Sequence, residues 1–140
     1  MRYWDSSALL PLLVRQPDSA RRTKQIREDF AIITWWASRV ECESALCRLE
    51  RGKDLKEGDL RVARERLQAL SESWSEIQPT PAVRDRAMRL LRVHPLRAAD
   101  ALQLAAALIA VSDAPRNFPF TCADARLAEA ARKEGFAVQV

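Results

Sequence analysis

The chain has 140 residues, of which 48% are hydrophobic and 30% are charged, and its net charge is +4. This composition suits a single globular domain, and the lack of an uncharged apolar run of about 18 residues argues against a transmembrane helix. The N-terminus lacks a basic region followed by an apolar stretch, so we expect no signal peptide. Three cysteines without metal-ligand spacing suit reduced thiols in the cytoplasm. The positive charge is carried mostly by arginine and modestly favours a polyanionic partner.

Apolar periodicity and helix-capping residues predict strands and helices along the whole chain. In chain order we expect a strand at 2–5, helices at 6–14 and 18–29, a strand at 31–35, helices at 36–51 and 57–73, an edge strand at 74–78, helices at 82–92 and 96–111, a strand at 118–122, a helix at 123–134 and a strand at 136–140. Strands that alternate with helices indicate a parallel sheet with right-handed connections. The expected fold is α/β, a three-layer α/β/α sandwich with a short central parallel sheet, formed by residues 1–140 as one domain.

Three aspartates lie beside or inside apolar segments. Asp5 and Asp124 each follow a predicted strand, where they also suit helix N-caps. Asp100 interrupts an alanine- and leucine-rich helix, and it shares a polar stripe with Arg97 and Gln103. It could pair with Arg97 there or respond to the helix dipole. Since isolated carboxylates in apolar surroundings are costly unless they are paired, neutralised or bound to a cation, these residues are candidates for a metal site.

A fourth acidic candidate comes from the predicted helix at 36–51. Glu41 and Glu43 flank its apolar stripe, one on each side, so helical periodicity does not choose between them. Carboxylates without histidine or thiolate partners are hard oxygen ligands, which favour Mg²⁺ or Mn²⁺ over zinc. The single histidine, His94, precedes Pro95 in a predicted turn and is not expected to do chemistry.

The segments around these acids resemble a known family. They are 4–9 (WDSSAL), 34–36 (TWW), 40–46 (VECESAL), 94–104 (HPLRAADALQL), 124–131 (DARLAEAA) and 135–136. In order and spacing they are similar to the PIN-domain ribonucleases, and more narrowly to the VapC-type toxins of type II toxin–antitoxin systems. The resemblance implies that Asp5, Glu41, Asp100 and Asp124 hold the metal and catalyse the reaction, and it selects Glu41 over Glu43. It also implies an assisting hydroxyl at Ser7, and it leaves Thr121 as a weaker candidate.

The resemblance further implies a function and partners. The chain would be an endoribonuclease that uses Mg²⁺, with Mn²⁺ able to substitute, and that hydrolyses RNA phosphodiester bonds with a metal-activated water. A cognate antitoxin would block the acidic pocket and occupy an apolar groove, for which Trp35 and Trp36 are candidates. A homodimer in the cytoplasm, with no membrane partner, is also implied.

Two other functions are compatible with parts of the sequence. A phosphatase of the haloacid-dehalogenase type also has an aspartate after its first strand, but it requires a second aspartate where this chain has Ser7. Its late lysine could only be Lys133. The second alternative is a non-catalytic PIN-like binding module, in which the acids serve as helix caps and ion pairs.

Overall fold

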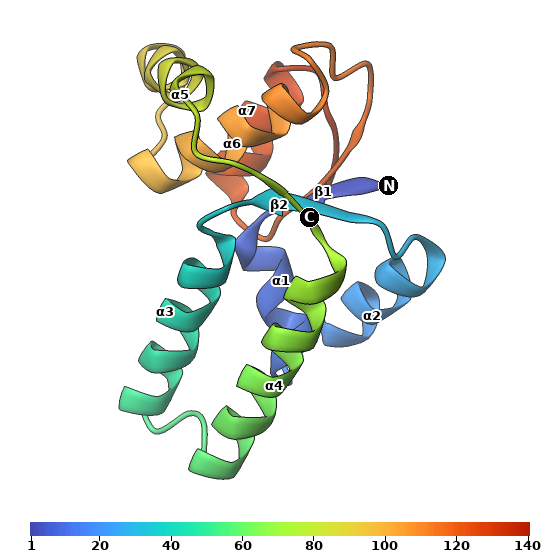
Figure 1. Ribbon diagram of the computed structural model, residues 1–140, viewed down its shortest axis with the longest axis vertical. Helices are drawn as coiled ribbons and strands as arrows, with labels where there is room; N and C mark the ends of the chain where they lie inside the picture. Colours follow the sequence, from blue (N-terminus) through green and yellow to red (C-terminus); the bar gives the residue numbers. More distant parts are fainter.

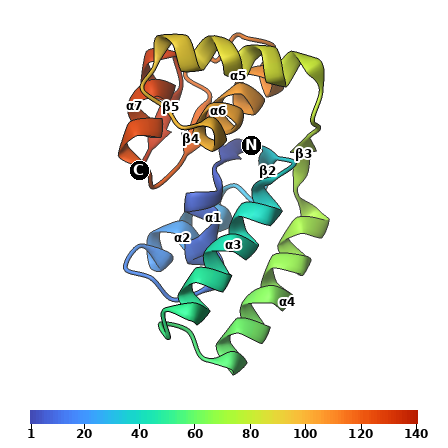
Figure 2. The ribbon, with the colours of Figure 1, turned by 90° about the vertical axis from the view of Figure 1, so that its left-hand side faces the viewer.

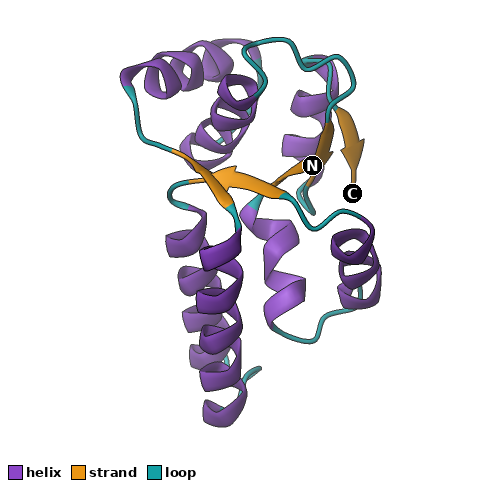
Figure 3. Ribbon diagram, turned by 45° about the vertical axis from the view of Figure 1, so that its right-hand side comes forward, coloured by secondary structure: helices purple, strands orange, loops and turns teal.

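The computed structural model describes all residues, 1–140, and contains a five-stranded sheet in the order β3-β2-β1-β4-β5. The strands are β1 (Arg2–Trp4), β2 (Ile32–Trp35), β3 (Ser75–Ile77), β4 (Pro119–Thr121) and β5 (Ala137–Gln139). Every neighbouring pair is parallel, as predicted (Figure 3). The strands are shorter than their apolar runs because the flanking residues turn directly into helices or loops.

Seven helices cover the two faces of the sheet, which confirms the three-layer sandwich (Figures 1 and 2). The chain places four of them on one face, namely α1 (Ser6–Leu13), α2 (Ser19–Glu28), α3 (Ser38–Arg51) and α4 (Glu57–Ser73). The opposite face carries α5 (Pro81–Val93), α6 (Ala98–Ala110) and α7 (Ala125–Lys133). None of these helices combines the length and the apolar character needed to cross a membrane.

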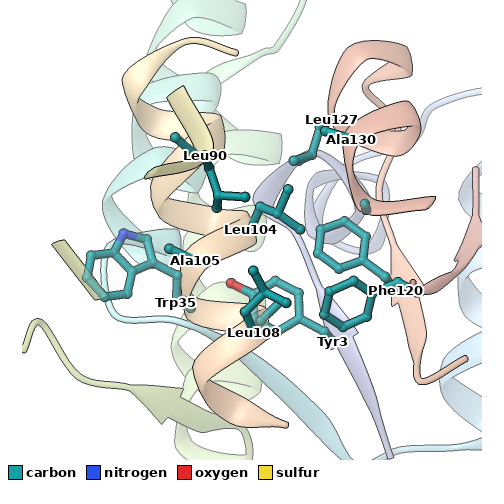
Figure 4. Close-up of a cluster of buried hydrophobic side chains, with 14 of the residues drawn as sticks. Tyr3, Trp35, Leu90, Leu104, Ala105, Leu108, Phe120, Leu127 and Ala130 are labelled. Atoms are coloured by element: carbon teal, nitrogen blue, oxygen red, sulfur yellow. The ribbon is translucent and has the colours of Figure 1, made fainter. Parts of the chain in front are cut away.

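Alternation along β1 divides the core into two parts, because successive strand residues point to opposite faces. Tyr3 packs with the α5–α7 layer, and Trp4 packs with the α1–α4 layer. In the first part, Tyr3 stacks on Phe120 with ring centroids 5.1 Å apart, and Leu104 and Leu127 close over them (Figure 4). Strand β1 is therefore packed on both faces, which fixes the position of Asp5 directly after it.

Several boundaries differ from the sequence-based prediction for local reasons. Helix α3 begins at Ser38 because Trp36 and Ala37 form a turn after β2. Helix α2 begins one residue later than predicted, at Ser19, and the Asp18 carboxylate makes no capping bond but pairs with Arg22. Gly135 ends α7 with a φ of +101°, a conformation that L residues with side chains rarely adopt.

Candidate functional site

The site lies where the chain changes direction across the sheet. From β1 the chain continues outward through β2 and β3, whereas β4 and β5 lie on the other side of β1. Ligands of open α/β sheets bind at such a point, outside the carboxyl ends of the strands. Asp5 and Asp124 follow β1 and β4, and the Asp5 amide donates to the Thr121 carbonyl across the pair at 2.9 Å. The two strands are thus neighbours, as the site prediction required.

Asp5 is almost completely buried, with 3% of its surface exposed. Its Oδ2 accepts hydrogen bonds from the Ser7 amide at 3.0 Å and from the Ser7 hydroxyl, so it caps α1. No arginine or lysine pairs with it. Burial raises the pKa of Asp5 to about 7, and the nearby charges of Glu41 and Asp100 contribute to this rise. Asp5 is therefore both a helix cap and a buried acid without a cationic partner.

Ser7 connects Asp5 to the neighbouring strand end. Its hydroxyl donates to Asp5 and accepts a hydrogen bond from the Ala123 amide at 2.8 Å. The residue before Asp124 is thereby tied to the start of α1. Ser7 therefore orients the Asp5 carboxylate.

The structure separates the two glutamates of α3. Glu41 is partly buried and accepts hydrogen bonds from the Ser6 hydroxyl at 2.7 Å and from the Gln103 amide at 3.2 Å. Burial raises the pKa of Glu41, the two hydrogen bonds lower it, and the charge of Asp100 raises it. Glu43 faces α4 instead, where Arg64 lies 2.6 Å from its carboxylate. Only Glu41 is thus placed among the other candidate acids.

A buried hydrogen-bond network lies beneath Glu41. Gln103 is completely buried, and its amide oxygen accepts from the Tyr3 hydroxyl at 2.7 Å while its amide nitrogen donates to Glu41 and, at 3.0 Å, to Ser38. The Ser38 hydroxyl lies 2.7 Å from that of Thr34. Sequence reasoning noted Gln103 only as part of the Asp100 stripe. It gave no sign of its partners, because they come from β1 and from another helix, α3.

Asp100 and Asp124 complete the set of predicted residues. Asp100 is half-buried in the first turn of α6 and forms no ion pair, so the alternative in which it pairs with Arg97 is not seen. Burial raises the pKa of Asp100, and the charge of Asp124 raises it further, against the opposing effect of Arg97 and Arg126. Asp124 is exposed and caps α7, since its Oδ1 accepts from the Leu127 amide at 2.7 Å.

The four acids are electrostatically connected but do not chelate in this arrangement. The charges of Glu41 and Asp100 contribute to the raised pKa of Asp5, and the charge of Asp124 contributes to the raised pKa of Asp100. No three acidic, histidine or cysteine side chains converge closely enough to hold one metal ion. Serine hydroxyls and backbone amides hold several of these carboxylates individually. Their chemistry nevertheless fits a hard divalent cation, because Asp5, Glu41 and Asp100 are buried or partly buried carboxylates without basic partners.

The remaining candidates lie elsewhere or have structural roles. His94 is buried against Glu134, with Nε2 2.7 Å from the carboxylate, at the carboxyl ends of α5 and α7. Burial raises the pKa values of Cys42 and Cys122 to about 12, so both thiols stay protonated. Thr121 is fully buried and its hydroxyl has no hydrogen-bond partner.

Comparison with known proteins gives a family and a fold. The family model described as PIN domain matches residues 2–133. The crystal structure of PAE2754 from Pyrobaculum aerophilum is similar to this chain, with a TM-score of 0.69 and 20% sequence identity, covering 99% of this chain and 89% of that one. At this identity the likeness shows a shared fold. No significant match was found among curated proteins.

Proposed function

Because this chain belongs to the PIN-domain family, we propose that it is a metal-dependent endoribonuclease and the toxin of a toxin–antitoxin pair. PIN domains are generally nucleases that use divalent metal ions. RNA as substrate, Mg²⁺ as the ion with Mn²⁺ as a substitute, and the toxin role are our extension of that activity. The resemblance of the segments around the four acids to VapC-type toxins supports this extension.

The observation that carries the proposal is the uncompensated charge of the site. The chain has 23 Lys and Arg residues, yet none forms an ion pair with Asp5, Glu41 or Asp100. Keeping partly buried carboxylates unpaired costs folding free energy, and such uncompensated groups concentrate at functional sites. A divalent cation would offset this cost.

Each residue has a defined part in the proposed reaction. Asp5, Glu41, Asp100 and Asp124 would hold the ion. When bound, the ion would lower the pKa of a water molecule and stabilise negative charge on the phosphate. Ser7 holds Oδ2 of Asp5, and Ser6 and Gln103 hold the two oxygens of Glu41, so these carboxylates are oriented before substrate binds.

The neighbouring surface suits an anionic substrate. Arg97 and Arg126 are exposed, form no ion pair, and are close enough to lower the pKa of Asp100. Arginines in such positions attract the phosphate backbone of nucleic acids independently of base sequence. The proposed substrate is therefore RNA that enters across the first turns of α6 and α7.

The proposed partners are an antitoxin and a second copy of the chain in the cytoplasm. Trp35 is 5% exposed and packs in the core, whereas Trp36 is 49% exposed. With Val40, Trp36 lines a groove of about 930 Å³ between α3 and α4. Of the two tryptophans, Trp36 is thus the one available to an apolar antitoxin segment.

Cleavage of RNA by the purified protein tests the function. We expect cleavage with Mn²⁺ or Mg²⁺, none after EDTA, and at least a 100-fold loss in Asp100→Asn, on the order of the loss of one electrostatic group at a catalytic centre. Asp59→Asn, an exposed acid on α4, is the matched control. Undiminished cleavage by Asp100→Asn, or no cleavage of any RNA with either ion, would overturn the proposal.

The two alternatives make different predictions. A phosphatase would need Lys133 near Asp5, but its amine pairs with Glu129 at the carboxyl end of α7, away from the Asp124 end. A binding module is consistent with the capping bonds of Asp5 and Asp124. It would bind RNA or protein without metal-dependent cleavage, so the same assay separates it from a nuclease.

A further inference from the structure

A cavity of about 500 Å³ opens beside Glu41, between α1, α3 and the first turn of α6. Its polar lining includes the hydroxyls of Ser6 and Ser44, and its apolar lining includes Leu10, Val40 and Ala99. Helices α1 and α3, which both line the cavity, pack against each other (Figure 2). Glu41 and Arg48 are the only charged residues in the lining. Because Glu41 is also one of the candidate site acids, the cavity adjoins the candidate site.

Arg48 is exposed, and its guanidinium forms no ion pair or hydrogen bond within the protein. It lies seven residues after Glu41 on α3, which is two helical turns, or about 10 Å along the axis, on the same face. Because helical side chains tilt toward the N-terminus, the Arg48 side chain lies over the turn nearer Glu41. Glu41 does not neutralise it, since the Glu41 carboxylate is bound by Ser6 and Gln103.

A free guanidinium near the Ser44 hydroxyl, four residues earlier on α3, is suited to a phosphate, which accepts two parallel hydrogen bonds from arginine. The apolar wall is suited to the sugar and base of the same nucleotide, which offer little charge. We propose that this cavity holds the nucleotide next to the cleaved bond and that Arg48 binds its phosphate. This inference rests on the proposed ribonuclease function and adds a substrate-positioning residue outside the four acids.

Charge removal on both sides of the contact tests the inference. A short RNA that the protein cleaves is prepared with one neutral methylphosphonate at each position next to the cleavage site in turn. At one position, the neutral group should lower kcat/KM of the wild type by about 10- to 100-fold, the usual effect of losing one charge-assisted hydrogen bond. In Arg48→Ala, the same neutral group should have no further effect, because the contact is already lost.

The expected signature separates positioning from structural damage. Arg48→Ala should raise KM more than it lowers kcat, and Arg48→Lys should recover part of the loss. In Arg48→Ala, the slope of log K for RNA binding against log salt concentration should become shallower by about 0.7, because one phosphate contact is lost. Arg27→Ala is the control, since Arg27 is exposed and unpaired on α2 and does not line the cavity. If the losses from Arg48→Ala and from every neutral phosphate simply multiply, the inference is wrong.

Failure of the inference can be told apart from failure of the proposed function. Active wild-type protein with an unaffected Arg48→Ala variant overturns the inference alone. RNA that binds but is not cleaved overturns the nuclease activity. In that case a weaker salt dependence of RNA binding in Arg48→Ala than in wild type still supports the phosphate contact, and an equal salt dependence overturns it. A protein that neither binds nor cleaves RNA overturns both.

Discussion

At the scale of single residues, Asp5 combines two demands that ordinarily conflict. Its carboxylate caps α1 through Ser7, yet burial without a cation raises its pKa to about 7. A cap is stabilising as an ion, whereas a desolvated acid is stabilised by a proton. The raised pKa shows that desolvation outweighs the two hydrogen bonds from Ser7. Asp5 should therefore make the metal-free protein less stable as it ionises.

This gives a pH-dependent prediction. The folded-state pKa of Asp5, about 7, lies above the ordinary value of 3.8. The folded protein therefore binds more protons than the unfolded chain between these values, and stability falls as the pH rises from about 4 to about 7. In EDTA, Asp5→Asn should remove the part of this fall that Asp5 causes, leaving the part due to Glu41 and Asp100. It should gain roughly 4 kcal/mol over wild type at pH 8, and much less at pH 4. Urea unfolding of both proteins across this range is the measurement. An equal difference at both pH values would mean that Asp5 does not titrate in this window.

Gln103 gives a second residue-scale prediction. Gln103→Leu leaves Tyr3, Ser38 and Glu41 each without one hydrogen bond, and it should cost about 2 kcal/mol of folding free energy. Because Glu41 then loses the hydrogen bond that orients its carboxylate from the buried side, kcat for RNA cleavage should fall while KM stays near the wild-type value. Gln68→Leu changes an exposed glutamine on α4 and should leave the folding free energy and kcat unchanged. A normal kcat in Gln103→Leu would limit Gln103 to a structural role.

At the scale of elements, a buried arginine fixes the strand end that carries Asp124. Arg22 of α2 is completely buried, pairs with Asp18 at 3.0 Å, and donates to the Cys122 carbonyl at 3.0 Å. Burial lowers the pKa of Arg22, and Asp18 opposes this effect. Helix α2, which carries none of the predicted site residues, thus holds the loop between β4 and α7 in place.

Replacing Arg22 should therefore affect stability and the site together. Arg22→Leu leaves the Cys122 carbonyl and Asp18 without their partner, and it should destabilise the protein by about 3 kcal/mol. Arg21→Leu is a matched control, because Arg21 pairs with the same Asp18 but is 51% exposed, and it should cost less than about 1 kcal/mol. Chemical denaturation measures both. Similar losses in the two variants would show that the buried contact to β4 contributes little.

At the scale of the whole molecule, the two layers of helices bring acids from four parts of the chain to one edge of the sheet. Asp5 and Asp124 follow adjacent strands, and Asp100 and Glu41 come from helices on opposite faces. Burial raises the pKa values of Asp5, Glu41 and Asp100, and the charges of neighbouring acids raise them further. The ionised acids therefore destabilise the folded protein until a cation or a basic group binds beside them.

A thermal-shift experiment tests this balance. Millimolar Mn²⁺ should raise the midpoint of unfolding of the wild type, because an ion that binds only the folded state stabilises it. In EDTA, Asp100→Asn should melt at the same temperature as wild type or higher, and it should gain less from Mn²⁺. A clear loss of stability in Asp100→Asn would instead mean that Asp100 is structural.

The sequence by itself determined the order of elements and the chemical type of the site. Strand and helix periodicity arises from local backbone geometry, so the parallel three-layer fold was predictable from apolar spacing. Asp5 and Asp100 were likewise recognisable as acids in apolar segments. Periodicity left Glu41 and Glu43 open, and the family resemblance selected Glu41. Only the tertiary structure decided the contacts, in which Gln103 donates to Glu41, Arg64 pairs with Glu43, and Arg22 donates to the Cys122 carbonyl. These contacts join residues far apart in the chain, and they depend on how whole helices pack across the sheet, which local periodicity does not encode.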